Sequence, residues 1–126
     1  MTASETGTLN RSGVAYHPTF RFYYSVNAGS ANYPIDAYDE QGNRLFNPVQ
    51  GFDYRGLWFN PAAATIEGNG FDDLGILVHN LNVNTGEPLG SGASVLAANQ
   101  PSTQSAGDLD TEDNEIIYYA TDTIYR

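Results

Sequence analysis

Residues Asp53–Asn69, DYRGLWFNPAAATIEGN, decide the fold class, because this stretch holds the only Trp of the chain and two short apolar runs. The runs flank Asn60-Pro61, and a Pro cannot donate to a β ladder, so two strands joined by a turn are predicted. Leu57 and Phe59 alternate with Trp58, which predicts that the first of these strands is covered on both faces. The Ala triplet after the turn is too short to propagate a helix.

The sequence on either side is also strand-like. Alternating side chains predict a strand with one buried face at Thr19–Ala28, and a turn of Asp and Gly predicts a hairpin at Tyr33–Phe46. An apolar run predicts a buried strand at Leu74–Leu81. A long loop with one weak strand is predicted at Leu89–Gly107, and two short strands are predicted at Asn114–Arg126.

Composition supports an all-β class for a chain of 126 residues, the length of one ordinary domain. Aromatic residues make up 13% of the sequence, and aromatic and β-branched residues fit a pleated, half-buried surface. Thirteen Gly and six Pro are spread along the chain and supply turns. Residues 1–13 lack periodicity and are predicted to be a flexible lead-in, so the structured segment is expected to cover residues 14–126.

The chain is acidic, with five Arg, no Lys and fifteen Asp and Glu, for a formal net charge of −10. This charge repels phosphate, so nucleic acid and anionic membranes are not expected as partners. A solvated surface is the simplest explanation of the charge. Cation binding and adaptation to a salty medium are the alternatives.

The sequence says little about compartment. It has no Cys, so it has no disulfide and no thiolate ligand for zinc. The N-terminus shows no signal peptide, and no apolar run approaches the roughly 18 residues of a membrane span. Localisation is therefore unassigned, and secretion of a longer parent protein stays open.

Two faint internal registers indicate repetition. Aligning Gly42 with Gly86 gives an offset of about 44 residues, and aligning Gly56 with Gly107 gives an offset of about 51 that also places Ile66 on Ile117. Both offsets are near the length of one β-propeller blade.

On the segments YDEQGNRLF (Tyr38–Phe46), RGLWFNP (Arg55–Pro61) and NEIIYYATDTIYR (Asn114–Arg126), the chain resembles β-propellers of the broad NHL and gluconolactonase-like kind. The resemblance implies antiparallel blades in an incomplete ring, about two blades long. Because a ring needs about 4 to 8 blades, it also implies the remainder of a longer chain or a homo-oligomer. A small β-sandwich is the alternative fold.

An acidic run invites a calcium hypothesis, since hard cations take several oxygen ligands. Its candidate ligands are Asp108, Asp110, Glu112 and Asp113. The EF-hand pattern fails, because Asp113 stands where that loop needs Gly and Tyr119 where it needs Glu. A solvated acidic turn is the simpler interpretation.

Tyr54, Arg55 and Trp58 form the predicted ligand-binding patch, because aromatic residues with Arg dominate interfaces and stack on sugars or peptides. The alternative, that these residues belong to the core, follows from the general burial of large aromatics. Gluconolactonase-like propellers hold a divalent metal on the ring axis. Glu67 would be the first residue to test for that role, although a solvent-facing strand Glu is the simpler expectation.

Other chemistry finds little support in the sequence. His17 and His79 are the only imidazoles, no G-x-S-x-G elbow supports a catalytic triad, and GNGFDD lacks the Lys of a phosphate loop. The favoured function is a non-catalytic propeller segment for binding or scaffolding, with a protein or carbohydrate ligand. The alternatives are a fragment of a metal-dependent propeller hydrolase or lactonase, and a sandwich that binds Ca²⁺ or carbohydrate.

Overall fold

A computed structural model describes residues 10–71, 74–95, 105–120 and 123–126. These residues form an all-β structure without an α-helix. Its strands are β1 Arg11–His17, β2 Phe22–Asn27, β3 Ile35–Tyr38, β4 Arg44–Phe46, β5 Trp58–Asn60, β6 Thr65–Asn69, β7 Ile76–Asn80, β8 Ala93–Val95, β9 Ser105–Asp110, β10 Glu115–Ala120 and β11 Thr123–Tyr125.

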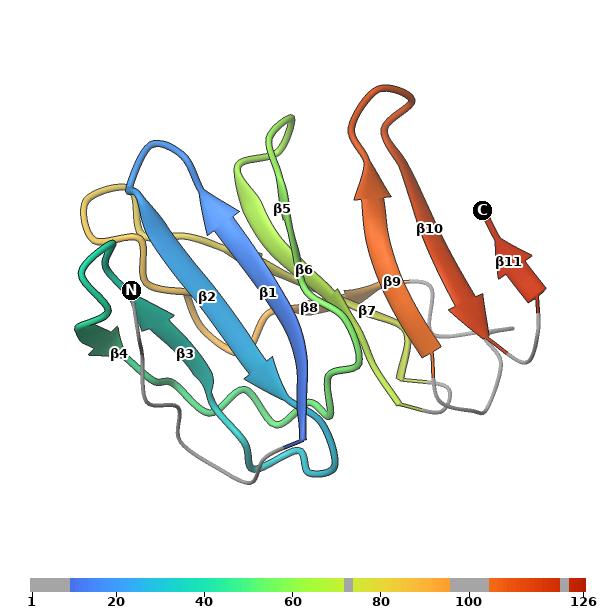
Figure 1. Ribbon diagram of the computed structural model, residues 1–126, viewed down its shortest axis with the longest axis horizontal. Coiled ribbons are helices and arrows are strands. Elements are labelled where there is room, and N and C mark those ends of the chain that lie inside the picture. Colours follow the sequence, from blue (N-terminus) through green and yellow to red (C-terminus); the bar gives the residue numbers. More distant parts are fainter. Residues whose placement is uncertain (1–9, 72–73, 96–104, 121–122) are drawn as a thin grey trace.

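The strands form three antiparallel sheets that are not closed into a barrel. The first sheet has the order β1-β2-β3-β4, the second β5-β6-β7-β8, and the third β9-β10-β11. Each is therefore a meander in which neighbours in sequence are neighbours in space, and Figure 1 shows the three sheets following one another in chain order.

The hairpins that join the first two strands of each sheet share one turn geometry. Each turn has four residues, 18–21, 61–64 and 111–114, and the last of them lies in the left-handed region. Those last residues are Arg21, Ala64 and Asn114, with φ of 58°, 55° and 55°. Asn60 and Asp110 stand before two of the turns, and the Oδ1 of each accepts hydrogen bonds from the backbone N–H groups two and three residues on. Such Asx bonds fix the start of a turn.

The predicted hairpin around Gly42 is confirmed by the pairing of β3 with β4. Asp39 Oδ1 accepts hydrogen bonds from the N–H groups of Gln41 and Asn43, at 2.9 and 2.8 Å. Gly42 has φ of 87°, a conformation that is free of strain only for Gly. The turn chemistry read from the sequence is therefore the chemistry that makes this turn.

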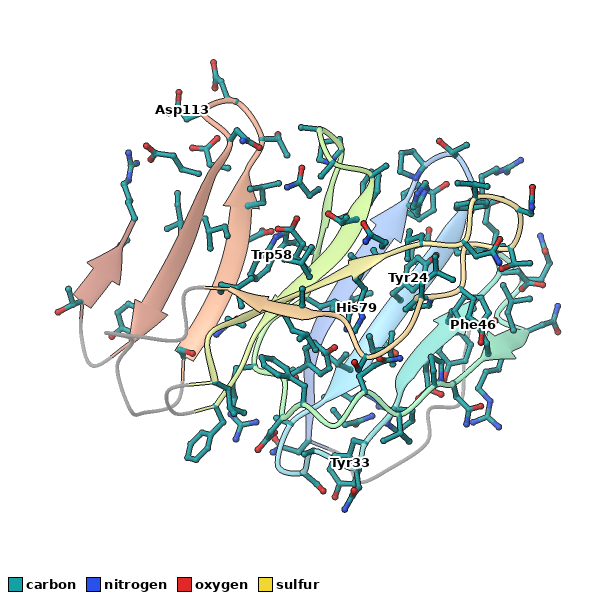
Figure 2. The ribbon with its side chains drawn as sticks, turned by 180° about the vertical axis from the view of Figure 1, so that it is seen from behind. Tyr24, Tyr33, Phe46, Trp58, His79 and Asp113 are labelled. Atoms are coloured by element: carbon teal, nitrogen blue, oxygen red, sulfur yellow. The ribbon has the colours of Figure 1, made fainter. Side chains whose placement is uncertain are left out.

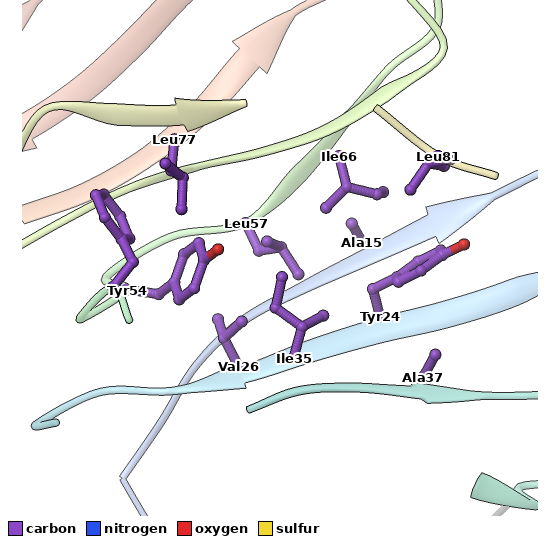
Figure 3. Packing of buried hydrophobic residues seen from close by; sticks show 11 residues of the cluster. Ala15, Tyr24, Val26, Ile35, Ala37, Tyr54, Leu57, Ile66, Leu77 and Leu81 are labelled. Carbon is purple, nitrogen blue, oxygen red and sulfur yellow. The ribbon is translucent and has the colours of Figure 1, made fainter. Parts of the chain in front are cut away.

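The main hydrophobic core lies between the first and second sheets (Figure 3). Tyr24 projects into it from β2, and its hydroxyl donates a 2.6 Å hydrogen bond to the carbonyl of Gly86 in the turn between β7 and β8. This bond ties the first sheet to the connection between β7 and β8 of the second sheet. The buried members of the core are Ala15, Tyr24, Val26, Ile35, Ala37, Phe52, Tyr54, Leu57, Ile66, Leu77 and Leu81.

The sheets approach one another at three glycines: Gly13 in β1, Gly56 just before β5, and Gly107 in β9. A Cβ on Gly13 would lie 2.6 Å from the backbone N of Leu57, and one on Gly56 would lie 2.7 Å from the carbonyl O of Gly107. A Cβ on Gly107 would lie 2.8 Å from Asn69 Oδ1. Real Cβ atoms do not come so close to backbone atoms, so these glycines set the spacing of the sheets.

Three sequence predictions need correction. β1 begins at Arg11, inside the expected lead-in, because the backbone of Arg11 pairs with Asn27 and this pairing does not need an apolar side chain. Residues 1–9 lie outside the described residues. β2 begins at Phe22 rather than near Thr19, since 18–21 form a turn, and it is buried on both faces rather than one. β9 was missed and read as part of a loop.

The described ranges contain no helix that is both long and apolar enough to cross a membrane.

Replacing Gly56 by Ala is expected to lower the free energy of unfolding by about 3 kcal/mol, because the new methyl group overlaps backbone and Asn69. The matched control is Gly51→Ala, where the methyl group meets nothing within 4 Å and only the left-handed φ of 69° is strained. The control is expected to cost about 1 kcal/mol. Urea denaturation of both variants measures the difference, and equal losses would contradict the close packing of the first strands.

Candidate functional site

A cleft of about 520 Å³ runs along the first strands of the three sheets. β1, β5 and β9 each lie at an edge of their own sheet, so each has one side that is not hydrogen-bonded to another strand of that sheet. An edge strand presents N–H and C=O groups along that side. The polar and aromatic side chains in the wall are Ser12, Tyr16, Arg55, Trp58, Phe59, Asp108 and Thr111.

Trp58 forms the wall of the cleft with its ring turned into the molecule (Figure 2). It is only 3% exposed, and its Nε1 donates a 2.9 Å hydrogen bond to Glu67 Oε2. The other carboxylate oxygen of Glu67 accepts hydrogen bonds from Asn60 Nδ2 at 2.9 Å and Thr65 Oγ1 at 2.7 Å. Three neutral donors thus satisfy a buried carboxylate, which would be costly without them.

Glu67 is therefore not the solvent-facing residue that the sequence suggested. It is 5% exposed and lies directly opposite Trp58 in the pairing of β5 with β6. Its two oxygens are committed to the donors just described, so the carboxylate acts as a tie between β5, β6 and their turn.

Arg55 is the buried cation of the cleft wall. It is 7% exposed, and its Nη1 and Nη2 donate hydrogen bonds to the two carboxylate oxygens of Asp53 at 2.5 and 3.2 Å. Its guanidinium lies 4.5 Å from the ring centroid of Phe71, and Nη1 also donates to the carbonyl of Tyr54. Bidentate pairing and ring stacking fix the orientation of this side chain.

Tyr54 lies in the core between the first two sheets rather than in the cleft wall (Figure 3). Its hydroxyl is 2.7 Å from Nε2 of His79, which is fully buried. Burial lowers the pKa of His79 to about 4 and raises the pKa of Tyr54. Both groups are therefore neutral at pH 7, and the pair is a buried hydrogen bond between uncharged side chains.

Of the predicted ligand-binding patch, the structure brings Arg55 and Trp58 to one cleft and leaves Tyr54 outside it. All three side chains are buried. The core alternative describes them better than an exposed recognition patch. The polar and aromatic side chains of the cleft that are exposed are others: Tyr16, Asp108 and Thr111.

The predicted calcium ligands lie in the hairpin of β9 and β10. Asp108 and Asp110 belong to β9, while Glu112 and Asp113 lie in the turn, at the tip of the hairpin in Figure 2. Asp110 Oδ1 is occupied as the acceptor that starts the turn. Among the described residues, no three His, Asp or Glu side chains converge as metal ligands, so the hairpin lends the calcium hypothesis no geometric support.

The sequence contains a third internal match, which marks the cleft and differs from the alignments of Gly42 with Gly86 and of Gly56 with Gly107. Residues 12–18, SGVAYHP, and 55–61, RGLWFNP, match in Gly, in apolar positions and in Pro at an offset of 43 residues. In the structure both segments run along the cleft and lead into equivalent turns.

No protein-family model matches this sequence, and no curated protein matches it significantly.

Replacing Glu67 by Ala is expected to lower the free energy of unfolding by about 3 kcal/mol, because it leaves three buried donors without an acceptor. Glu67→Gln keeps one acceptor oxygen and should cost less. Glu112→Ala, in an exposed turn, is the control and should leave the midpoint of urea unfolding unchanged. A Glu67→Ala variant as stable as the control would contradict the role assigned to the carboxylate.

Stability is expected to fall as the pH drops from about 6.5 to about 4. The unfolded chain protonates His79 near its ordinary pKa of 6.5, whereas the folded chain holds that pKa near 4, so acid favours the unfolded state across this window. The loss attributable to His79 is about 3 kcal/mol.

The variant His79→Gln retains an acceptor for Tyr54 and cannot titrate, so its stability should vary less with pH. Burial also lowers the pKa of His17, and that contribution remains in both proteins. Chemical unfolding of both proteins at a series of pH values gives the comparison. Parallel curves for the two proteins would show that His79 does not make this contribution.

Proposed function

We propose that this chain is a non-catalytic β-propeller segment in which the three sheets are successive blades and the cleft along their first strands holds a ligand. The observation that carries the proposal is the arrangement of the sheets. All three are meanders in the same order, their first strands line one cleft, and the equivalent turns that follow those strands begin at residues 18, 61 and 111, which are 43 and 50 residues apart. Both spacings are close to the length of a propeller blade.

Details of the turns and glycines support the same proposal. Gly42 and Gly86, which one sequence register aligned, both lie in the turn between the third and fourth strands of a sheet. Gly56 and Gly107, aligned by the other register, meet where the second and third sheets approach. The sequence resemblance implied about two blades, and the described residues contain three sheets of four, four and three strands.

The favoured ligand is an extended peptide segment of another protein. Three edge strands line the cleft, and their outer N–H and C=O groups can pair with an added strand, which is a recurring mode of peptide recognition. The chain carries a net charge of −10 and exposes Asp108 in the cleft, so a peptide with Lys or Arg fits its field better than an acidic one. A carbohydrate is the second candidate, because Tyr16 is a partly exposed aromatic side chain in the wall.

The hydrolase or lactonase alternative finds no comparable support. The residue singled out for a metal, Glu67, is buried and already bonded by three donors. A binding role needs only the edge strands and exposed side chains of the cleft.

Selection of a random peptide phage library against the full chain, with a glycan array as a second arm, tests the proposal. Recovered peptides should be rich in Lys and Arg, and calorimetry should show binding. Thr111→Trp, which places a large ring at the exposed rim of the cleft, should weaken it about tenfold. Val83→Trp, in an 85% exposed position outside the cleft, is the control and should bind as the parent does.

Enrichment of glycans instead of peptides would replace the favoured ligand by a sugar. Equal binding by both Trp variants, or no binding in either arm, would remove the cleft as the site.

A further inference from the structure

A small pocket of about 210 Å³ lies apart from the cleft, where the turn after β1, the turn after β5 and the connection after β7 meet. It shares no residue with the wall of the cleft. An apolar cavity of roughly 150 Å³ holds a benzene molecule, so this pocket has room for one ring. Four of its six residues are apolar, and the six are His17, Thr19, Phe20, Ala64, Leu81 and Val83.

Hydrogen bonds hold the walls of this pocket in place. On one side, the N–H of Arg21 donates to the carbonyl of His17 at 2.8 Å and closes the turn at 18–21. On the other side, Asn82 Oδ1 accepts hydrogen bonds from the backbone N–H groups two and three residues on. This turn keeps the side chain of Val83 at the rim, where it is 85% exposed. A preformed pocket loses less free energy on binding than one that must rearrange.

His17 is the one titratable side chain that lines this pocket, and it is only 4% exposed. The centroid of its ring lies 4.7 Å from that of Phe20 and 4.2 Å from that of Phe59. Its Nδ1 accepts a long hydrogen bond, 3.4 Å, from the N–H of Phe20. Two ring contacts and one hydrogen bond therefore fix the orientation of the imidazole.

The hydrogen bond to Nδ1 determines what the other ring nitrogen can do. Burial lowers the pKa of His17, so the ring is neutral at pH 7. A neutral imidazole has one N–H, and because Nδ1 is the acceptor, the hydrogen is on Nε2. Within the described residues this N–H has no acceptor. A nearly buried donor in apolar surroundings gains free energy when a ligand brings it an acceptor.

Charge limits the kind of acceptor. The chain has a net charge of −10, and no Arg lines the pocket, so a carboxylate is disfavoured there. The oxygen of a carbonyl group accepts a hydrogen bond without bringing a charge. One ring with one carbonyl oxygen therefore matches the room, the apolar walls and the single donor.

We propose that this pocket binds a small uncharged molecule, a single ring that carries a carbonyl group. The ring packs against Phe20, Leu81 and Val83, and the carbonyl oxygen accepts from Nε2 of His17. Mostly apolar walls with few polar groups are typical of small-molecule sites, and the polar groups fix the orientation of the ligand. The site is separate from the cleft and does not depend on the ligand proposed for it.

NMR titration of the full chain with two probes of the same shape tests the site. Acetophenone has the carbonyl group, and α-methylstyrene has a CH₂ group in place of its oxygen. Each probe is added up to its solubility limit. Acetophenone should shift the methyl resonances of Leu81 and Val83 and the ring resonances of His17, and it should bind about tenfold more tightly than α-methylstyrene. Equal affinity for the two probes, or no shift at these residues, would overturn the proposal.

The variant His17→Phe gives a matched comparison, because it keeps a ring between Phe20 and Phe59 but has no N–H. It should bind the two probes with equal affinity, and a remaining preference for acetophenone would show that His17 does not hold the carbonyl group. Circular dichroism checks that the variant is folded, and the comparison of probes on the parent protein does not depend on it.

The variant Thr111→Trp separates this site from the cleft. It alters the rim of the cleft, so it should bind acetophenone as the parent does even though it weakens peptide binding. Weaker binding of acetophenone by Thr111→Trp, with shifts at cleft residues, would place the probe in the cleft and remove the pocket as a second site. Failure of peptide selection alone would leave this result unchanged.

Discussion

The close approach of the first strands at Gly13, Gly56 and Gly107 is the constraint on which the arrangement of the sheets depends. Backbone atoms and the Asn69 amide occupy the space where a Cβ would stand, so no other residue fits without moving a sheet. None of these glycines has a left-handed φ. Their role is close packing, and it brings three edge strands to the wall of one cleft.

Polar side chains buried beside these glycines hold the arrangement in one register. Trp58 and Glu67 join β5 to β6, Arg55 is held by Asp53, and Tyr54 meets His79 across the core. Each pair disfavours other strand registers, because a shift of one strand against its neighbour would leave a buried donor or charge without its partner. The residues that look most reactive in the sequence thereby hold the structure together.

The sequence predicted the class of the fold and several turns, because these depend on local chemistry. The hairpin at Asp39–Asn43 and the turn at Asn60-Pro61 follow from residues that set their own backbone geometry. β9 escaped prediction because Ser105–Asp110, SAGDLD, is small and polar; it is a strand because it pairs with the apolar β10. Likewise, Glu67 was expected to face solvent, and it is buried because the pairing of β5 with β6 brings the Trp58 indole onto its carboxylate.

The sequence by itself determined that the chain is all-β, where some of its tight turns fall, and that it carries a net charge of −10. These properties are fixed within a few residues or by composition. Only the tertiary structure decided which aromatic and charged side chains are buried, which strands form sheet edges, and which side chains line the cleft. Those properties arise from contacts between residues far apart in the chain, such as Gly13 with Leu57 and Gly56 with Gly107, and no local pattern encodes such distances.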